Sequence, residues 1–369
     1  MMQVFIQMYY PYLLITLFVF LFLALNFYAY KNSIKLPIYY ELILVLGLIV
    51  FAGLRSFDID YFGYIEIFYK VEAASHGSLF NQALEAKDIL FGFMAIVKSS
   101  LDLSITTFLL VSAALSVGIK FAVFRYAFGN AILGLGLYFF TYYFVQDFTQ
   151  IRVAIALACC FLALVFLLKE HRFFYCFFCI IALGFHAQTV FFVIATSPLL
   201  TNLKYKYALV CFSLIVTGLL FSNFEFFTNL TSSRTSTYLG ATSLKITAIT
   251  AIALNFILIS TTYLSTIGNF KQSFDQEIAK VSMLLYIGGF IFFFITLSTS
   301  EVFAWRVYEM FSAFGIFIIL TGLRSKPKNI TITASLIYIF LNMVIIIRSG
   351  LLVPYSINKS FTEALHGFF

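Results

Sequence analysis

Long apolar stretches separated by short polar connections run along the whole chain. A helix needs about 20 apolar residues to cross the hydrocarbon core of a bilayer, and stretches of nearly that length recur throughout the sequence. The pattern predicts an all-α, polytopic integral membrane protein that forms one transmembrane domain over residues 1–369. The twelve predicted membrane-spanning helices cover roughly 11–29, 38–54, 104–124, 130–146, 151–168, 173–185, 187–203, 205–222, 244–265, 281–299, 304–323 and 330–348.

The composition supports this prediction. Hydrophobic residues make up 62% of the chain and charged residues 11%, whereas soluble globular chains carry about 25% charged residues. A chain of this length cannot bury so much apolar surface in a water-soluble core. The net charge of +7 fits the rule that membrane proteins keep Lys and Arg on the cytoplasmic side. Because the sequence has no run of Lys and Arg with interleaved aromatic residues, nucleic acid is not an expected partner.

Basic residues in the short connections predict the orientation. If the connection with Lys31 and Lys35 lies inside, alternating the direction of successive spans places all the remaining short basic connections inside as well, as the positive-inside rule requires. Two longer segments then face outward and are expected to contribute to a site: 223–243, and 55–103 with surface-lying amphipathic helices near 61–73 and 89–99. The other basic residues assigned to the inner side are Lys120, Arg125, Lys169, Arg172, Lys204, Lys206, Lys271, Lys280, Arg324, Lys326 and Lys328.

Arginine is concentrated on the predicted outer side. A single arginine at a helix end often reaches lipid headgroups and does nothing else. A guanidinium, however, is always charged and can bind phosphate oxygens through two parallel hydrogen bonds. Several such groups from separate elements therefore predict a shared site for a diphosphate at the level of the headgroups. Five of the eight arginines have this placement: Arg55, Arg152, Arg234, Arg306 and Arg348.

Acidic residues near Arg55 allow two interpretations. Asp58 and Asp60 could bind a divalent metal, or Asp60 could pair with Arg55 or with a substrate hydroxyl. No further cluster of Glu or His accompanies them, so local pairing is favoured, and neither a metal nor another cofactor is predicted.

His186 is a candidate general base because of its predicted depth. The fourteen residues from Arg172 to His186 span about 21 Å as a helix, which is less than the ~30 Å hydrocarbon core. A break in the helix at that depth is tolerated only against protein or a water-filled cavity. His186 could accept a proton from a sugar hydroxyl, or it could hydrogen-bond a neighbouring helix.

Two further groups complete the candidates. Arg306 and Glu309 are three residues apart on one predicted helix face, with Glu301 nearby, so Glu309 is expected to hold Arg306 or to accept a proton. Tyr355, beyond the last predicted span, could contact sugar rings or anchor the chain at the membrane interface.

Several short motifs resemble the EpsG/Wzy-type polysaccharide polymerase family. They are Gly53-Leu54-Arg55 followed by Asp60-Tyr61-x-x-Tyr64, then Gln150-x-Arg152-x-x-Ile155, and Phe185-His186, with Arg306 as a looser match. The sequence departs from the family pattern at Ile59, where Thr is usual, and at Gln188, where a small residue is usual.

The resemblance implies a GT-C-like glycosyltransferase of the metal-independent branch, in the bacterial inner membrane, with its site facing the periplasm or outside. Its substrate would be an undecaprenyl diphosphate-linked oligosaccharide among membrane lipids, and a chain-length regulator protein would be a partner. Arg152, Arg234 and Arg306 would bind the diphosphate, Arg55 and Asp60 would lie at a sugar, and His186 would be the base. The remaining substrate-binding candidates are Tyr61, Tyr64, Gln150, Glu301, Arg348 and Tyr355.

Two other functions remain as alternatives. A ligase would move finished glycan from the same lipid to another acceptor by nearly identical chemistry. A flippase or transporter would need charges along the whole membrane path and often has inverted repeats, and neither is evident in the sequence.

Overall fold

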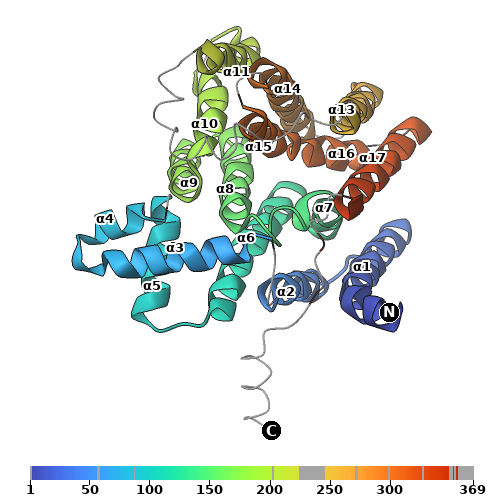
Figure 1. Cartoon of the computed structure of the whole chain (residues 1–369). Coiled ribbons are helices and arrows are strands. Elements are labelled where there is room, and N and C mark those ends of the chain that lie inside the picture. The colour runs from blue at the N-terminus through green and yellow to red at the C-terminus, as the bar shows by residue number, and fades with distance from the viewer. Residues whose placement is uncertain are drawn as a thin grey trace. The chain divides into compact units, whose positions relative to one another are not determined.

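The computed structural model describes residues 2–55, 59–86, 88–201, 203–223, 246–270, 273–297, 300–325, 328–348, 352 and 355, and their regular secondary structure is helical (Figure 1). Within these residues, seven helices are long and apolar enough to cross a membrane, and six apolar helical segments are shorter. Each of the twelve predicted spans overlaps one of these segments. The all-α polytopic membrane fold is therefore confirmed, although five of the predicted spans correspond to apolar helical segments of only 10–17 described residues.

Contacts between the helices group the chain into two compact units. The first unit comprises Met1–Leu162, Phe177–Ala187 and Asn342–Phe369, and the second comprises Ala163–Cys176 and Gln188–Leu341. The single transmembrane domain stays a prediction. Both units expose many large apolar side chains, as expected for surfaces that face lipid.

In the first unit, α2 (Ile38–Gly53) packs along α6 (Ile105–Phe128), while α1 (Met2–Lys31) contacts α2 and α7 (Ile132–Tyr138). Gly53 makes the close approach of α2 to α6 possible, because a Cβ atom there would lie 2.7 Å from the Leu110 Cα. The ends of α6 follow from local chemistry. The Ser104 hydroxyl accepts a hydrogen bond from the Thr107 amide at 3.1 Å, and Gly129 closes the helix with φ 75°.

Three short helices form a separate group within the first unit, consisting of α3 (Tyr61–Ala73), α4 (Leu79–Leu84) and α5 (Ile89–Ser100), with the single turn η1 (Ala74–His76) between α3 and α4 (Figure 1). The predicted amphipathic helices at 61–73 and 89–99 correspond closely to α3 and α5. Gly92 of α5 lies against the α4 backbone, where a Cβ atom would be 2.7 Å from the Ala83 Cα.

Lys120, one of the basic residues assigned to the inner side, lies within a helix, as the predicted span at 104–124 requires. Lys120 is fully buried within α6, which continues to Phe128. A charged side chain is tolerated inside an apolar helix when protein groups satisfy it, and the partners of Lys120 come from other elements described below. Arg125, one turn from the end of α6, forms an ion pair with the buried Glu41 of α2.

In the second unit, α14 (Ser273–Thr296) packs against α11 (Lys206–Asn223), α15 (Glu301–Ser312) and α16 (Gly315–Arg324), and α13 (Ile246–Thr266) packs against α16. The predicted outer loop at 223–243 lies outside the described residues from 224 onward. Further elements of the described chain are α8 (Ile151–Leu168), α9 (Arg172–Phe185), η3 (Ala187–Thr189), α10 (Val190–Thr196), η4 (Ser197–Leu200) and α17 (Asn329–Arg348).

Candidate functional site

Residues 144–150 form a buried turn between two helical elements of the first unit. The turn follows η2 (Phe139–Tyr143), a single π-helical turn, and leads into α8. The twelve residues of α7 and η2 span only about 18 Å, so this turn is expected at membrane depth, where irregular backbone must be surrounded by protein or water. Most of its side chains are buried. We call this segment the 144–150 turn.

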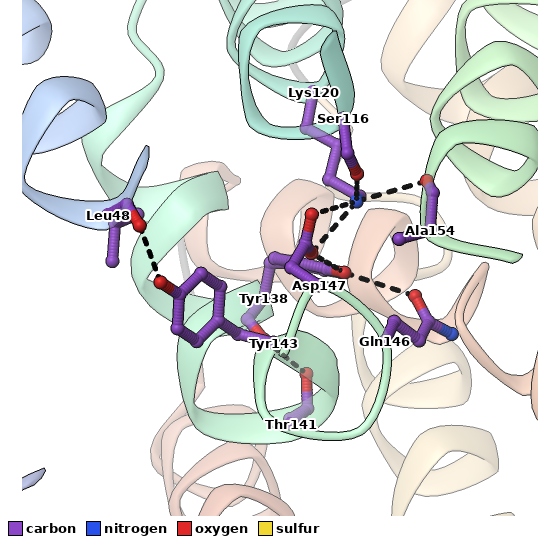
Figure 2. Close-up of polar contacts among 9 residues, drawn as sticks. All are labelled: Leu48, Ser116, Lys120, Tyr138, Thr141, Tyr143, Gln146, Asp147 and Ala154. Atoms are coloured by element: carbon purple, nitrogen blue, oxygen red, sulfur yellow. Dashed lines mark hydrogen bonds and ion pairs between the residues drawn. The ribbon is translucent and has the colours of Figure 1, made fainter. Parts of the chain in front are cut away.

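A buried ion pair connects the 144–150 turn to α6. The Lys120 Nζ donates to the Asp147 carboxylate at 3.0 and 3.2 Å, and both side chains are 0% exposed. The same ammonium donates to the Ser116 hydroxyl and to the Ala154 carbonyl. Figure 2 shows these groups together with Tyr138, whose hydroxyl donates to Asp147 and whose ring lies 4.4 Å from Nζ. The pair therefore joins α6, α7, the turn and α8.

Arg55 lies beside the same turn, in an aromatic environment. It is 0% exposed, its Nη1 donates to the Ala52 carbonyl, and its Cζ lies 5.0 Å from the centre of the Phe148 ring. The Tyr355 ring stacks on Phe51 with centroids 4.6 Å apart, and its hydroxyl donates to the Phe51 carbonyl at 3.0 Å. Burial raises the pKa of the Tyr355 hydroxyl to about 12. These contacts of Tyr355 are packing contacts.

Tyr64 connects α3 to the end of the turn. Its hydroxyl donates to the Thr149 carbonyl at 2.5 Å and accepts from the Ile151 amide at 3.1 Å. The side chain is 3% exposed, and the Ile151 amide at the start of α8 has no partner within its own helix. Tyr64 thus fixes the first residue of α8, directly before Arg152.

Arg152 and the residue after His186 bind to one carboxylate. The Arg152 Nη1 lies 2.5 Å from the Asp88 Oδ2, and the Ala187 amide donates to the other oxygen, Oδ1, at 3.2 Å. The Arg152 Cζ also lies 5.6 Å from the centre of the Phe91 ring. His186 itself is half-buried between the end of α9 and the start of η3. The structure thus brings Arg152 and the backbone next to His186 to a single acidic residue.

Other sequence candidates lie at different places in the described chain. Asp60 is exposed at the start of α3, where Tyr61 contacts Phe62. Gln150 is half-buried at the end of the 144–150 turn, and Arg348 is exposed at the end of α17.

The described candidates of the second unit come from α15. Arg306 is exposed, Glu309 is buried, and Glu301 is half-buried in the first turn of the helix. Their convergence with Arg152 stays a prediction. Asp58 and Arg234 lie outside the described residues.

Sequence reasoning missed two acidic residues of the site. Asp147 lies between two predicted spans, and Asp88 lies directly before a predicted amphipathic helix. An isolated charge next to a long apolar stretch could have indicated both. Within the described part of the chain, no three His, Cys, Asp or Glu side chains are grouped so that they could hold a metal ion.

The fold and this site define a polytopic α-helical membrane protein with charged groups clustered around a buried turn. The chain belongs to the EpsG family, whose sequence model matches residues 38–357, and the predicted family resemblance is thereby confirmed. This bacterial family indicates a polysaccharide-polymerase-type membrane protein, similar to glycosyltransferases. Neither the curated proteins nor the solved structures contain a match to the chain.

Proposed function

We propose that the protein is a polymerase of the bacterial inner membrane. It would transfer a growing glycan from undecaprenyl diphosphate to the non-reducing end of a new lipid-linked repeat unit. The observation that supports this most directly is the shared position of Arg152 and the His186–Ala187 segment on the Asp88 carboxylate. A leaving-group ligand and a candidate base are thereby held in one region of the first unit.

In the proposed reaction, the acceptor hydroxyl oxygen attacks the anomeric carbon of the growing glycan. The bond from that carbon to the phosphate oxygen breaks, and its electron pair leaves with the lipid diphosphate, so the anomeric configuration inverts. Negative charge then develops on phosphate oxygens, where a fixed guanidinium in a site shielded from water stabilises it. Arg152 suits this role because a guanidinium has five N–H donors, and the contact with Asp88 engages Nη1.

The acceptor hydroxyl must lose a proton as the new bond forms. His186 is the proposed base, because a neutral imidazole accepts a proton near neutral pH. Arg234 and Arg306 are proposed as further diphosphate ligands, Arg55 and Asp60 as contacts to a sugar, and Glu309 as the residue that holds Arg306 or accepts a proton.

The proposed site faces the periplasm or the outside, where lipid-linked repeat units would reach it through the outer leaflet. The proposed partners are therefore the lipid-linked oligosaccharide itself, the surrounding membrane lipids and a protein that regulates chain length.

The test is to incubate the purified protein in lipid nanodiscs with a synthetic lipid diphosphate-linked oligosaccharide, with and without a chelator. We expect a ladder of polymers in both samples. Arg152→Ala should abolish the ladder, and Arg152→Lys should be impaired by at least about tenfold, since a point charge does not replace the planar fork. Arg172→Ala is the matched control, because Arg172 is exposed at the start of α9.

Three results would contradict the proposal. The wild-type protein could leave the substrate unchanged, it could transfer the glycan only to a different acceptor, as a ligase would, or it could move the lipid across a vesicle membrane without chemical change. An unaffected ladder with Arg152→Ala would remove Arg152 from the diphosphate site.

A further inference from the structure

We infer that Asp88 is a positioning residue that holds the Arg152 guanidinium and the backbone next to His186 in one fixed arrangement. The effect of this arrangement on catalysis rests on the proposed function. The arrangement itself can be measured without any enzymatic activity.

The local structure around Asp88 shows that its carboxylate does not serve its own helix. Asp88 occupies the N-cap position of α5, yet its side chain makes no capping hydrogen bond. Aspartate at an N-cap usually accepts a hydrogen bond from one of the first backbone amides of its helix, as Ser78 and Ser104 do for α4 and α6. The carboxylate of Asp88 instead reaches α8 and the segment after α9.

The first turn of α5 contacts the Arg152 guanidinium in two ways. Asp88 accepts from its Nη1, and Phe91, three residues later, presents its ring 5.6 Å from Cζ. Asp88 at the N-cap and Phe91 in the first turn therefore both contact the guanidinium from the beginning of α5. A charge-assisted hydrogen bond together with a cation–π contact fixes the guanidinium in direction as well as in position.

The charged groups of Asp88 and Arg152 are largely shielded from water. Asp88 is 7% exposed, and the Arg152 side chain is 22% exposed. A carboxylate at this depth needs hydrogen-bond partners in the protein, and the Arg152 Nη1 and the Ala187 amide each bind one of its two oxygens. Loss of the carboxylate would therefore release the arginine and the His186–Ala187 backbone together.

This coupling gives Asp88 a kinetic signature. A neutral amide of the same shape removes a negative charge beside Arg152, so it should not weaken the binding of an anionic substrate. It should, however, misplace the groups that act in the transition state, where a displacement of about 1 Å can cost about 100-fold in rate. We expect Asp88→Asn to keep KM within about threefold and to lower kcat by about 10- to 100-fold.

The kinetic experiment uses Asp88→Asn, Asp88→Ala, Arg152→Lys and the double variant Asp88→Ala/Arg152→Lys in nanodiscs with the lipid diphosphate-linked oligosaccharide. The double variant should lose less activity than the two single losses combined, because residues that act as a unit are not additive. Rates are expressed per folded protein, so a purely structural role would leave kcat unchanged. Glu85→Ala is the matched control, since Glu85 is exposed three residues before Asp88.

A second measurement is independent of activity. Hydrogen–deuterium exchange should show the Ala187 amide protected in the wild-type protein and exchanging at least about tenfold faster in Asp88→Ala, as expected for loss of a hydrogen bond to a charged group. Equal exchange in the two proteins would overturn the positioning role even if polymerisation is confirmed. Suppose that Ala187 exchanges faster in Asp88→Ala, but that the wild-type protein forms no polymer. This result would support the arrangement around Asp88 and reject only the proposed reaction.

Discussion

Lys120 and Asp147 should stabilise the first unit only as a pair, because either charge alone would be buried without its partner. In Lys120→Met, the Asp147 carboxylate stays in the protein interior with the Tyr138 hydroxyl as a remaining partner. Removing one member of a buried ion pair costs about 3–5 kcal/mol because the other charge is left uncompensated. We expect the free energy of unfolding to fall by that amount.

Replacing both members should restore most of this loss. In Lys120→Met/Asp147→Leu no charge is buried, and apolar residues of similar volume in place of a buried pair are often neutral or stabilising. The structure supports this expectation, because the Tyr138 hydroxyl can donate its one hydrogen to the Gln146 Oε1, 3.1 Å away, once the Asp147 carboxylate is removed. The Ala154 carbonyl and the Ser116 hydroxyl lose the Lys120 ammonium as a hydrogen-bond donor in the single and in the double variant alike.

The assay is a titration of detergent-solubilised protein with sodium dodecyl sulfate, followed by far-ultraviolet circular dichroism. The control is the exposed pair Glu66–Lys70 on α3, whose side chains are 66% and 53% exposed. Exposed pairs four residues apart on a helix contribute only about 0.3–0.5 kcal/mol, so Lys70→Met should have little effect. A loss below about 1 kcal/mol for Lys120→Met, or strictly additive effects in the double variant, would refute the reasoning.

Three further outcomes are expected. His186→Ala should lower kcat by about 100-fold or more if the imidazole accepts the acceptor proton, and near-wild-type polymer ladders would exclude that role. Gly92→Ala should lower the free energy of unfolding by about 1–3 kcal/mol, because the added Cβ would lie 2.7 Å from the Ala83 Cα; an unchanged detergent titration would contradict this. Tyr64→Phe should cost about 1 kcal/mol of stability and reduce polymer yield, since the Thr149 carbonyl loses its hydroxyl donor, and unaltered proteolysis and activity would count against it.

Hydropathy alone determined the class of fold, for a simple physical reason. A helix must be apolar over about 20 residues to cross the bilayer, and stretches of that length can be recognised directly in the sequence. The predicted span at 151–168 coincides with α8, and the predicted amphipathic helix at 61–73 coincides with α3. The end of α6 was predicted four residues too early, at residue 124, whereas the helix continues to Phe128 and Gly129 ends it.

Candidate site residues were less predictable because their roles depend on partners that are distant in sequence. Arg152 and His186 could be selected from the sequence, one as an arginine at the start of a span and the other as a histidine at a helix break. Only the tertiary structure brought Arg152 and the Ala187 amide, next to His186, to Asp88, which is 64 residues from Arg152 along the chain. Tyr64 was expected to touch substrate, but the structure shows its hydroxyl bonded to the backbone at the start of α8.

The sequence by itself therefore determined that this protein is helical, crosses a membrane several times and carries the motifs of its family. The tertiary structure decided which charges are satisfied inside the protein. Lys120 and Asp147 are 27 residues apart and come from two different elements, yet they form a fully buried pair. The apolar pattern of a helix reflects the solvent that surrounds it, whereas the packing of one helix against another decides which charges pair.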